Sequence, residues 1–174
     1  MPKAVARKPK QDVEQTMRAY FEATGRRDLD AMASFWKPDV VEDITGVGIL
    51  RGEHELRAFF GELFAAVPDL ETTVKRMVPG DGICVVEWRM RGNFNGSPLM
   101  GIDATGTWLE LRGCDVFELD DGKIARYTAY QDGMELARAI GMLPPRDSAA
   151  EKAMFAAFNG VTKVRQAIRA RRDG

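Results

Sequence analysis

The sequence has a single histidine and only two cysteines among its 174 residues. The histidine, His54, lies off the apolar stripe of the helix expected around it, so we expect it at the surface. Histidine-based catalytic triads and hydrolytic zinc sites both require histidine in a defined position, and two thiols cannot build a structural zinc site. We therefore expect no metal and no cofactor. We also expect no disulfide framework from Cys84 and Cys114.

Long apolar segments are also absent. No run approaches the roughly 20 residues of a membrane-spanning helix, and the first ten residues, MPKAVARKPK, lack the apolar core of a secretory signal. We therefore expect a cytoplasmic protein that has no membrane partner. The glycines at positions 46, 48 and 52 miss the spacing of dinucleotide-binding and P-loop motifs, which argues against a nucleotide site there.

Charge is distributed unevenly along the chain. Residues 11–150 contain 24 acidic and 15 basic side chains, whereas residues 1–10 contain four basic and no acidic ones. Residues 151–174 contain six basic and two acidic side chains. An acidic body with basic ends argues against nucleic acid as a partner. Solvated tails are the simpler interpretation of the two ends.

Helical spacing dominates the first part of the sequence, and strand-like alternation joined by turn residues dominates the second. We expect helices near 12–25, 28–36, 53–67, 134–143 and 148–171, and strands near 40–44, 70–78, 82–94, 107–119 and 123–132. Helices followed by consecutive hairpins predict an α+β domain, with helices packed on one face of a curved, mostly antiparallel sheet. Its expected bounds are 11–145, with a disordered leader over 1–10 and a helical extension over 146–174.

One carboxylate breaks the alternation of the strand over residues 108–119, WLELRGCDVFEL. Asp115 falls in phase with Leu111 and Phe117, on the apolar side, whereas the other charges of the strand fall on the opposite side. Burial raises the pKa of a carboxyl group, so a carboxyl in a dry pocket can stay protonated and donate a hydrogen bond. The structural alternative is a buried bond from Asp115 to Tyr20, Tyr127, Tyr130 or the backbone.

Two other residues could complete an acid–base site. Asp43 ends a strand ahead of glycine-rich backbone, where catalytic residues and turn residues are both common. Tyr20 lies beside Phe21 on the helix face that should meet the sheet, where a core aromatic is the usual outcome. Together, a solvated carboxylate, a buried carboxyl and a tyrosine could remove a proton beside a ketone and hold the enolate oxygen.

The sequence resembles the SnoaL-like polyketide cyclases over about residues 11–145. The motifs that carry the resemblance are GRRDLDAMASFWKPDVVEDITG, AAVPDLETTV, GSPLMGIDATGTWLELRGCDVFELDDGKI and YQDGMELARAIGMLP. These cyclases belong to the nuclear-transport-factor-2-like superfamily, which includes ketosteroid isomerase. The resemblance implies a sheet wrapped into a cone around a hydrophobic pocket, and a homodimer formed through the sheet.

The resemblance also implies roles for single residues. By similarity to ketosteroid isomerase, Asp43 is the general base, while Tyr20 and a protonated Asp115 hold the oxyanion. By similarity to the SnoaL-like cyclases, Asp132 is the acid–base of an aldol ring closure. The candidate pocket or core residues are Trp36, Phe60, Phe64, Trp88, Met90, Phe94, Met100 and Trp108.

The resulting hypothesis is a cofactor-independent enzyme that forms an enolate on a hydrophobic cyclic ketone or polyketide. It would be an aldol cyclase or a double-bond isomerase. One alternative is a non-catalytic domain that binds a small molecule. Another is an epoxide hydrolase or dehydratase on the same scaffold, although the Asp–Arg–Asp set of such a hydrolase has no convincing placement in the sequence.

Overall fold

The computed structural model describes residues 10–172. Residues 1–9, which make up most of the expected disordered leader, lie outside the described residues. The helices are α1 (Lys10–Gly25), α2 (Leu29–Ala33), α3 (Gly52–Ala66), α4 (Gly133–Ala139) and α5 (Ala149–Arg172). The strands are β1 (Trp36–Ile44), β2 (Gly48–Arg51), β3 (Glu71–Pro79), β4 (Ile83–Asn93), β5 (Trp108–Asp120) and β6 (Lys123–Gln131).

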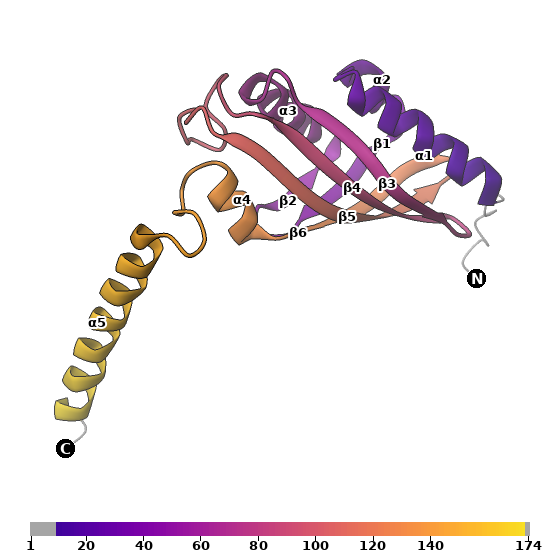
Figure 1. Cartoon of the computed structure of the whole chain (residues 1–174). Helices are drawn as coiled ribbons and strands as arrows, with labels where there is room; N and C mark the ends of the chain where they lie inside the picture. Colours follow the sequence, from indigo (N-terminus) through magenta and orange to yellow (C-terminus); the bar gives the residue numbers. More distant parts are fainter. Residues whose placement is uncertain (1–9, 173–174) are drawn as a thin grey trace.

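The strands form one six-stranded sheet in the order β2-β1-β6-β5-β4-β3. Every neighbouring pair is antiparallel except β1 and β6, which run parallel. Helix α1 packs against β3 and β4 and helix α3 against β1, so both cover the same, inner face of the sheet (Figure 1). The structure confirms the predicted α+β fold with a mostly antiparallel sheet.

The segment around Trp36 differs from the prediction. The second helix was expected to continue to Trp36, but α2 ends at Ala33 and Trp36 starts β1, where it pairs with Ile124 of β6. Its side chain is fully buried against the core, which a sheet position provides and a short surface helix does not. Strand β2 also lies within the glycine-rich segment that was expected to be only a connection.

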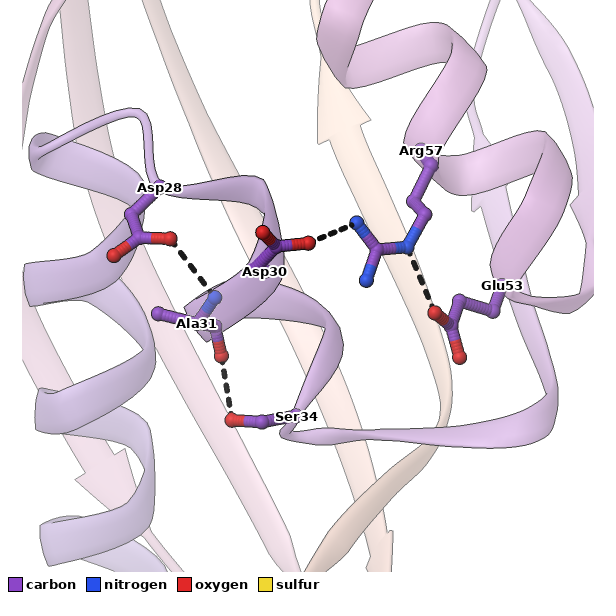
Figure 2. A network of polar contacts seen from close by, with 6 residues as sticks. All are labelled: Asp28, Asp30, Ala31, Ser34, Glu53 and Arg57. Carbon is purple, nitrogen blue, oxygen red and sulfur yellow. Dashed lines mark hydrogen bonds and ion pairs between the residues drawn. The ribbon is translucent and has the colours of Figure 1, made fainter.

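Polar side chains cap α2 and tie it to α3 (Figure 2). Asp28 is the N-cap of α2, because its carboxylate accepts a hydrogen bond from the backbone N–H of Ala31 at 3.0 Å. The guanidinium of Arg57 in α3 contacts Asp30 of α2 at 2.9 Å and Glu53 at 2.7 Å. These exposed ion pairs contribute little energy but hold α3 in register with α2.

Helix α5 does not pack on the sheet. It extends away from the rest of the chain (Figure 1), and Glu151 is its only buried residue. None of the helices within residues 10–172 combines the length and apolarity needed to cross a membrane.

Candidate active site

A cavity of about 80 Å³ lies between the inner face of the sheet and the helices α1 and α3. Its walls are mostly apolar and aromatic, with few polar groups. The lining residues are Tyr20, Phe21, Thr24, Glu42, Ile44, Val47, Phe59, Phe60, Leu63, Trp88, Met90, Leu99, Met100, Leu111, Asp115, Tyr127, Ala129, Gln131 and Leu136. Such a cavity with convergent polar groups is the usual form of a small-molecule site.

Strand β1 turns Glu42, and not Asp43, into this cavity. Val40, Glu42 and Ile44 are buried on the inner face, whereas Asp43 is half-buried on the opposite side of the strand. Successive side chains of a strand point to opposite faces, so a carboxylate at position 43 cannot share the cavity with one at position 42. The expected position of Asp43 at the pocket is therefore wrong, and Glu42 takes its place.

Asp115 lies where the alternation predicted, on the inner face in the middle of β5. It pairs with Val86 of β4 and Ala129 of β6, and its side chain is 8% exposed. Within residues 10–172, no group forms a hydrogen bond with its Oδ1 atom. A buried polar atom without a partner is rare in proteins. The cavity thus presents one carboxyl oxygen that is free to bond a ligand.

Gly113 makes room for the indole ring beside Asp115. A Cβ atom at this position would lie 2.3 Å from Cζ2 of Trp88, which lines the cavity. We expect Gly113→Ala to displace the ring and to lower the free energy of unfolding by about 1–3 kcal/mol. Chemical denaturation measures this loss. Gly133→Ala, where nothing lies within 4 Å of the added atom, is the matched control. Equal stability of the two variants would contradict the prediction.

Burial dominates the electrostatics of the two cavity carboxyls. It raises the pKa of Glu42 to about 8 and the pKa of Asp115 to about 7. The charge of Asp115 raises the pKa of Glu42 further. Because interacting carboxyls lose their protons in two separate steps, the pair holds about one proton at neutral pH.

The hydrogen bonds made by the two carboxyls differ. The hydroxyl of Tyr127 donates to Oε2 of Glu42 at 2.5 Å, a length typical of a phenol bonded to a carboxylate. This bond lowers the pKa of Glu42 and so favours its ionised form. For Asp115, a weaker interaction with the Trp88 indole lowers the pKa. The indole N–H also lacks a well-formed hydrogen bond among the described residues. The Tyr127 bond thus stabilises the form of the pair in which Glu42 is ionised and Asp115 carries the proton.

The register of the sheet places Tyr127 beside Glu42. The two residues are direct partners in the parallel β1–β6 pairing. The ring of Tyr127 stacks on Phe117 with centroids 4.8 Å apart, which fixes the direction of its hydroxyl. Tyr20 of α1 packs edge-on against Phe117 and hydrogen-bonds Tyr127. Burial and the nearby charge of Glu42 raise the pKa of both tyrosines, so both stay protonated.

Removal of the Tyr127 hydroxyl is expected to make Glu42 harder to ionise. In Tyr127→Phe the ring stack remains, but the hydrogen bond that lowers the pKa of Glu42 is lost. Any reaction that uses Glu42 as a base should slow about ten-fold at pH 7, and its pH–rate profile should shift to higher pH by about one unit. Tyr130→Phe, at an exposed position on the other sheet face, should leave the profile unchanged. Identical profiles for the two variants would exclude this role.

The remaining sequence-predicted residues divide into two groups. Phe60, Trp88, Met90 and Met100 line the cavity, whereas Trp36, Phe64 and Phe94 belong to the core beside it. Trp108 is 55% exposed, so its assignment to the pocket or core is wrong.

Asp132 lies outside the cavity as well. Its exposed carboxylate caps α4 by accepting hydrogen bonds from the backbone N–H groups of Met134 and Glu135. A carboxylate that caps a helix in this way is held at the helix start. It does not reach the cavity, so the expected position of Asp132 at the site is wrong. His54 is exposed, as expected. No cluster of His, Cys, Asp or Glu within residues 10–172 is arranged to hold a metal ion.

The loop between β4 and β5 closes one side of the cavity. Leu99 and Met100 at its tip line the cavity, and the backbone N–H of Met100 bonds to the carboxylate of Glu62 in α3. Threonine hydroxyls at the end of the loop donate to the backbone carbonyls of Ala139 and Ile140. The loop is thus tied to both α3 and α4.

Comparisons with known proteins agree with this geometry. The profile of the SnoaL-like domain matches residues 17–127. A search of curated proteins gives no match. A candidate SnoaL-like polyketide cyclase from Jannaschia sp. CCS1 superposes with a TM-score of 0.68 and 24% identity, covering 81% of this chain and 100% of its own.

Two further solved structures extend the range of relatives. A candidate ketosteroid isomerase from Kribbella flavida DSM 17836 has a TM-score of 0.56 and 18% identity, covering 71% of this chain and 79% of its own. An LEH-like epoxide hydrolase from M. tuberculosis has a TM-score of 0.60 and 18% identity, covering 75% of this chain and 90% of its own. At such identities the structures establish the fold alone, while the profile match establishes the family. This chain belongs to the family of SnoaL-like domains, on the nuclear-transport-factor-2-like fold.

Proposed function

We propose that the protein is a cofactor-independent acid–base enzyme that forms an enolate on a hydrophobic cyclic ketone or polyketide. The observation that carries this proposal is the pair Glu42 and Asp115, which line one apolar cavity and have pKa values raised close to neutrality. Catalytic acids and bases work best with pKa values near the working pH. Two buried carboxyls that had no function would only destabilise the fold.

The proposed reaction divides the work between the two carboxyls. The Glu42 carboxylate takes a proton from the carbon next to the carbonyl, and the electron pair of that C–H bond moves into the enolate. The protonated Asp115 donates a hydrogen bond from its free carboxyl to the enolate oxygen. The new enolate then either regains the proton at another carbon, which moves a double bond, or attacks a second carbonyl, which closes a ring. Each carboxyl is expected to contribute about 10²–10⁴-fold in rate.

The composition of the lining limits the class of ligand. Among the described residues that line the cavity there are two acidic side chains and no lysine, arginine or histidine. A carboxylate or phosphate buried beside Glu42 would therefore lack a counter-charge, whereas a neutral carbonyl can accept the proton of Asp115. The same lining offers no arginine for the Asp–Arg–Asp set of an epoxide hydrolase, which argues against that alternative.

The volume of the cavity adds a requirement. At about 80 Å³ it is well below the roughly 300–1,000 Å³ of typical small-molecule sites. A ligand with several fused rings therefore requires the loop that carries Met100 to move outward. The loop would then have to release the bond from the backbone N–H of Met100 to Glu62 of α3.

Deuterium uptake from D₂O into a panel of neutral cyclic ketones tests the proposal. The panel should run from one ring to four, and mass spectrometry should locate the label. We expect exchange at the carbon next to the carbonyl with the wild-type protein, and none above background with Glu42→Gln. Ketones that bind, as shown by calorimetry, but never exchange would point to a non-catalytic binding domain. Exchange that survives Glu42→Gln would exclude Glu42 as the base.

A further inference from the structure

The described chain supplies no counter-charge to the two carboxyls of the cavity. Glu42 and Asp115 line it together with apolar, aromatic and neutral polar residues, and no lysine, arginine or histidine lies among the described lining residues. Within residues 10–172, no cationic side chain shifts the pKa of either carboxyl. Buried charges in proteins are normally paired with an opposite charge. The cavity thus departs from the usual pattern of a buried acidic pair.

The negative charge of the pair favours a cationic ligand. With about one proton shared between two carboxyls at neutral pH, the pair carries a net charge of about −1 in an apolar space. Loss of the shared proton would make this charge larger. A neutral ligand leaves the charge uncompensated, whereas a ligand with one positive charge makes the complex neutral. Electrostatics therefore favours a monovalent cation in this cavity.

Each carboxyl has an oxygen that can accept a hydrogen bond from such a ligand. Oδ1 of Asp115 has no partner within residues 10–172, and its side chain is 8% exposed. Glu42 accepts the bond of Tyr127 through Oε2, so Oε1 takes no part in that bond. An ammonium group has only donors, and a carboxylate has only acceptors. The two carboxyls can therefore satisfy an ammonium group that enters the cavity.

The walls of the cavity favour an organic cation over a metal ion. Metal ions such as Ca²⁺ and Mg²⁺ require several oxygen ligands, and no cluster of three His, Cys, Asp or Glu side chains occurs within the part of the chain that the structure describes. Alkylated ammonium groups are instead bound by aromatic rings, through attraction to the ring faces. Six of the nineteen lining residues are aromatic, namely Tyr20, Phe21, Phe59, Phe60, Trp88 and Tyr127.

The size of the cavity limits the part of the ligand that is enclosed. Its volume is about 80 Å³. At roughly 30 Å³ for a group the size of a water molecule, this space holds about three non-hydrogen atoms. A dimethylammonium head, with one nitrogen and two methyl carbons, is of that size and needs no movement of the loop. Met100 lines the cavity and is 41% exposed, so the remaining substituent of the amine can leave beside it.

We propose that the cavity binds the ammonium head of a hydrophobic tertiary amine, with Glu42 and Asp115 as its counter-charge and the aromatic walls around its methyl groups. This class of ligand goes beyond the proposed ketone chemistry, and its binding does not require the protein to form an enolate. The ammonium head occupies the place of a ketone carbonyl, so amines and ketones should compete for the site.

The first test compares an amine with its neutral isostere by calorimetry at pH 7. N,N-dimethylbenzylamine and isobutylbenzene share one shape, but the hydrocarbon has CH in place of the protonated nitrogen. We expect the amine to bind at least about 10-fold more tightly than the hydrocarbon. Glu42→Gln should weaken amine binding at least about 10-fold and leave hydrocarbon binding within about two-fold, because only the charge changes. Asp43→Asn, on the other face of β1, should change neither.

Three outcomes of this experiment would overturn the proposal. They are no binding of the amine, equal binding of amine and hydrocarbon, and amine binding that survives Glu42→Gln. The comparison of the two ligands on the wild-type protein needs no variant, so it stands even if Glu42→Gln fails to fold.

The second test follows amine binding by the wild-type protein from pH 6 to pH 8. The amine stays protonated over this range while the carboxyl pair loses protons, so its dissociation constant should fall at least about five-fold. The other ionisable lining groups, Tyr20 and Tyr127, stay protonated. Binding of isobutylbenzene should not change with pH. A flat profile for the amine would contradict its contact with the pair.

The outcome is independent of the test for enolate formation. Amine binding without any deuterium exchange into ketones would reject the proposed reaction and leave the amine site intact. Exchange into ketones without amine binding would reject the amine site alone.

Discussion

Glu42→Gln is expected to lower the rate of ketone deuteration by about 10²–10⁴-fold while the protein stays folded. The substitution keeps the size of the side chain and its bond to Tyr127, but it removes the carboxylate whose ionised form that bond favours. The binding constant of a ketone should change much less than the rate, because Asp115 still donates to the carbonyl oxygen. Single-turnover kinetics and calorimetry on the same ketone separate the two effects.

The neighbouring residue supplies the matched control. Asp43→Asn makes the equivalent change of carboxylate to amide one position along β1, on the side that faces away from the cavity. We expect it to leave the rate within about two-fold of the wild type, since a substitution on the opposite face of the sheet, away from the cavity, rarely alters a site. If Asp43→Asn abolishes exchange and Glu42→Gln does not, the assignment of the base is reversed and the account of the cavity fails.

Stability should fall steeply as the pH rises, which is the second large effect. The pKa of Glu42 is about 8 in the folded protein and near 4.5 in the unfolded chain, and that of Asp115 is about 7 against 3.8. Each folded-state pKa is raised, so the folded protein binds these protons more tightly than the unfolded chain does. The stabilisation is complete below about pH 4, decreases through the range between the two pKa values, and is lost above about pH 8.

The expected size of this effect is several kcal/mol. One pKa unit corresponds to about 1.4 kcal/mol, which gives an upper figure of roughly 5 kcal/mol for each carboxyl. Urea denaturation at pH 5 and pH 8.5 measures the difference in unfolding free energy. The double variant Glu42→Gln/Asp115→Asn should show a much smaller difference than the wild type, whereas Asp43→Asn should keep the wild-type difference. Equal pH dependence in the wild type and the double variant would mean that both carboxyls have ordinary pKa values.

The part of the site on β5 follows directly from the sequence. In residues 108–119 the other charged side chains fall on one side and the leucines and Phe117 on the other, so the phase of the strand is clear and Asp115 stands out on the apolar side. Strand β1 gives a weaker signal, because Val40 and Val41 are both apolar and either phase fits its core. The strand begins at Trp36, and this longer register places Glu42 inward. If the alternation is followed over the whole of β1, the same rule that placed Asp115 on the inner face also places Glu42 there.

Other parts of the site depend on features that alternation does not encode. The β5–β6 register shifts between Glu118 and Leu119, so Ile124 and Tyr127 both face inward although they are three residues apart. A bulge of this kind changes the phase of a strand and cannot be located from residue pattern alone. Asp132 follows β6 just as a catalytic residue would, but its carboxylate is used as a helix cap.

The most direct test of the account is the titration of the cavity carboxyls themselves, by carbon-13 NMR of protein labelled at the side-chain carboxyls of aspartate and glutamate. The experiment needs no substrate, and Glu42→Gln and Asp115→Asn assign the two signals. We predict two carboxyl resonances that titrate together, with midpoints near 7 and near 8, so that one proton remains on the pair at neutral pH. Midpoints near 4 for both carboxyls would contradict the account, because neither group would then be available as an acid at pH 7.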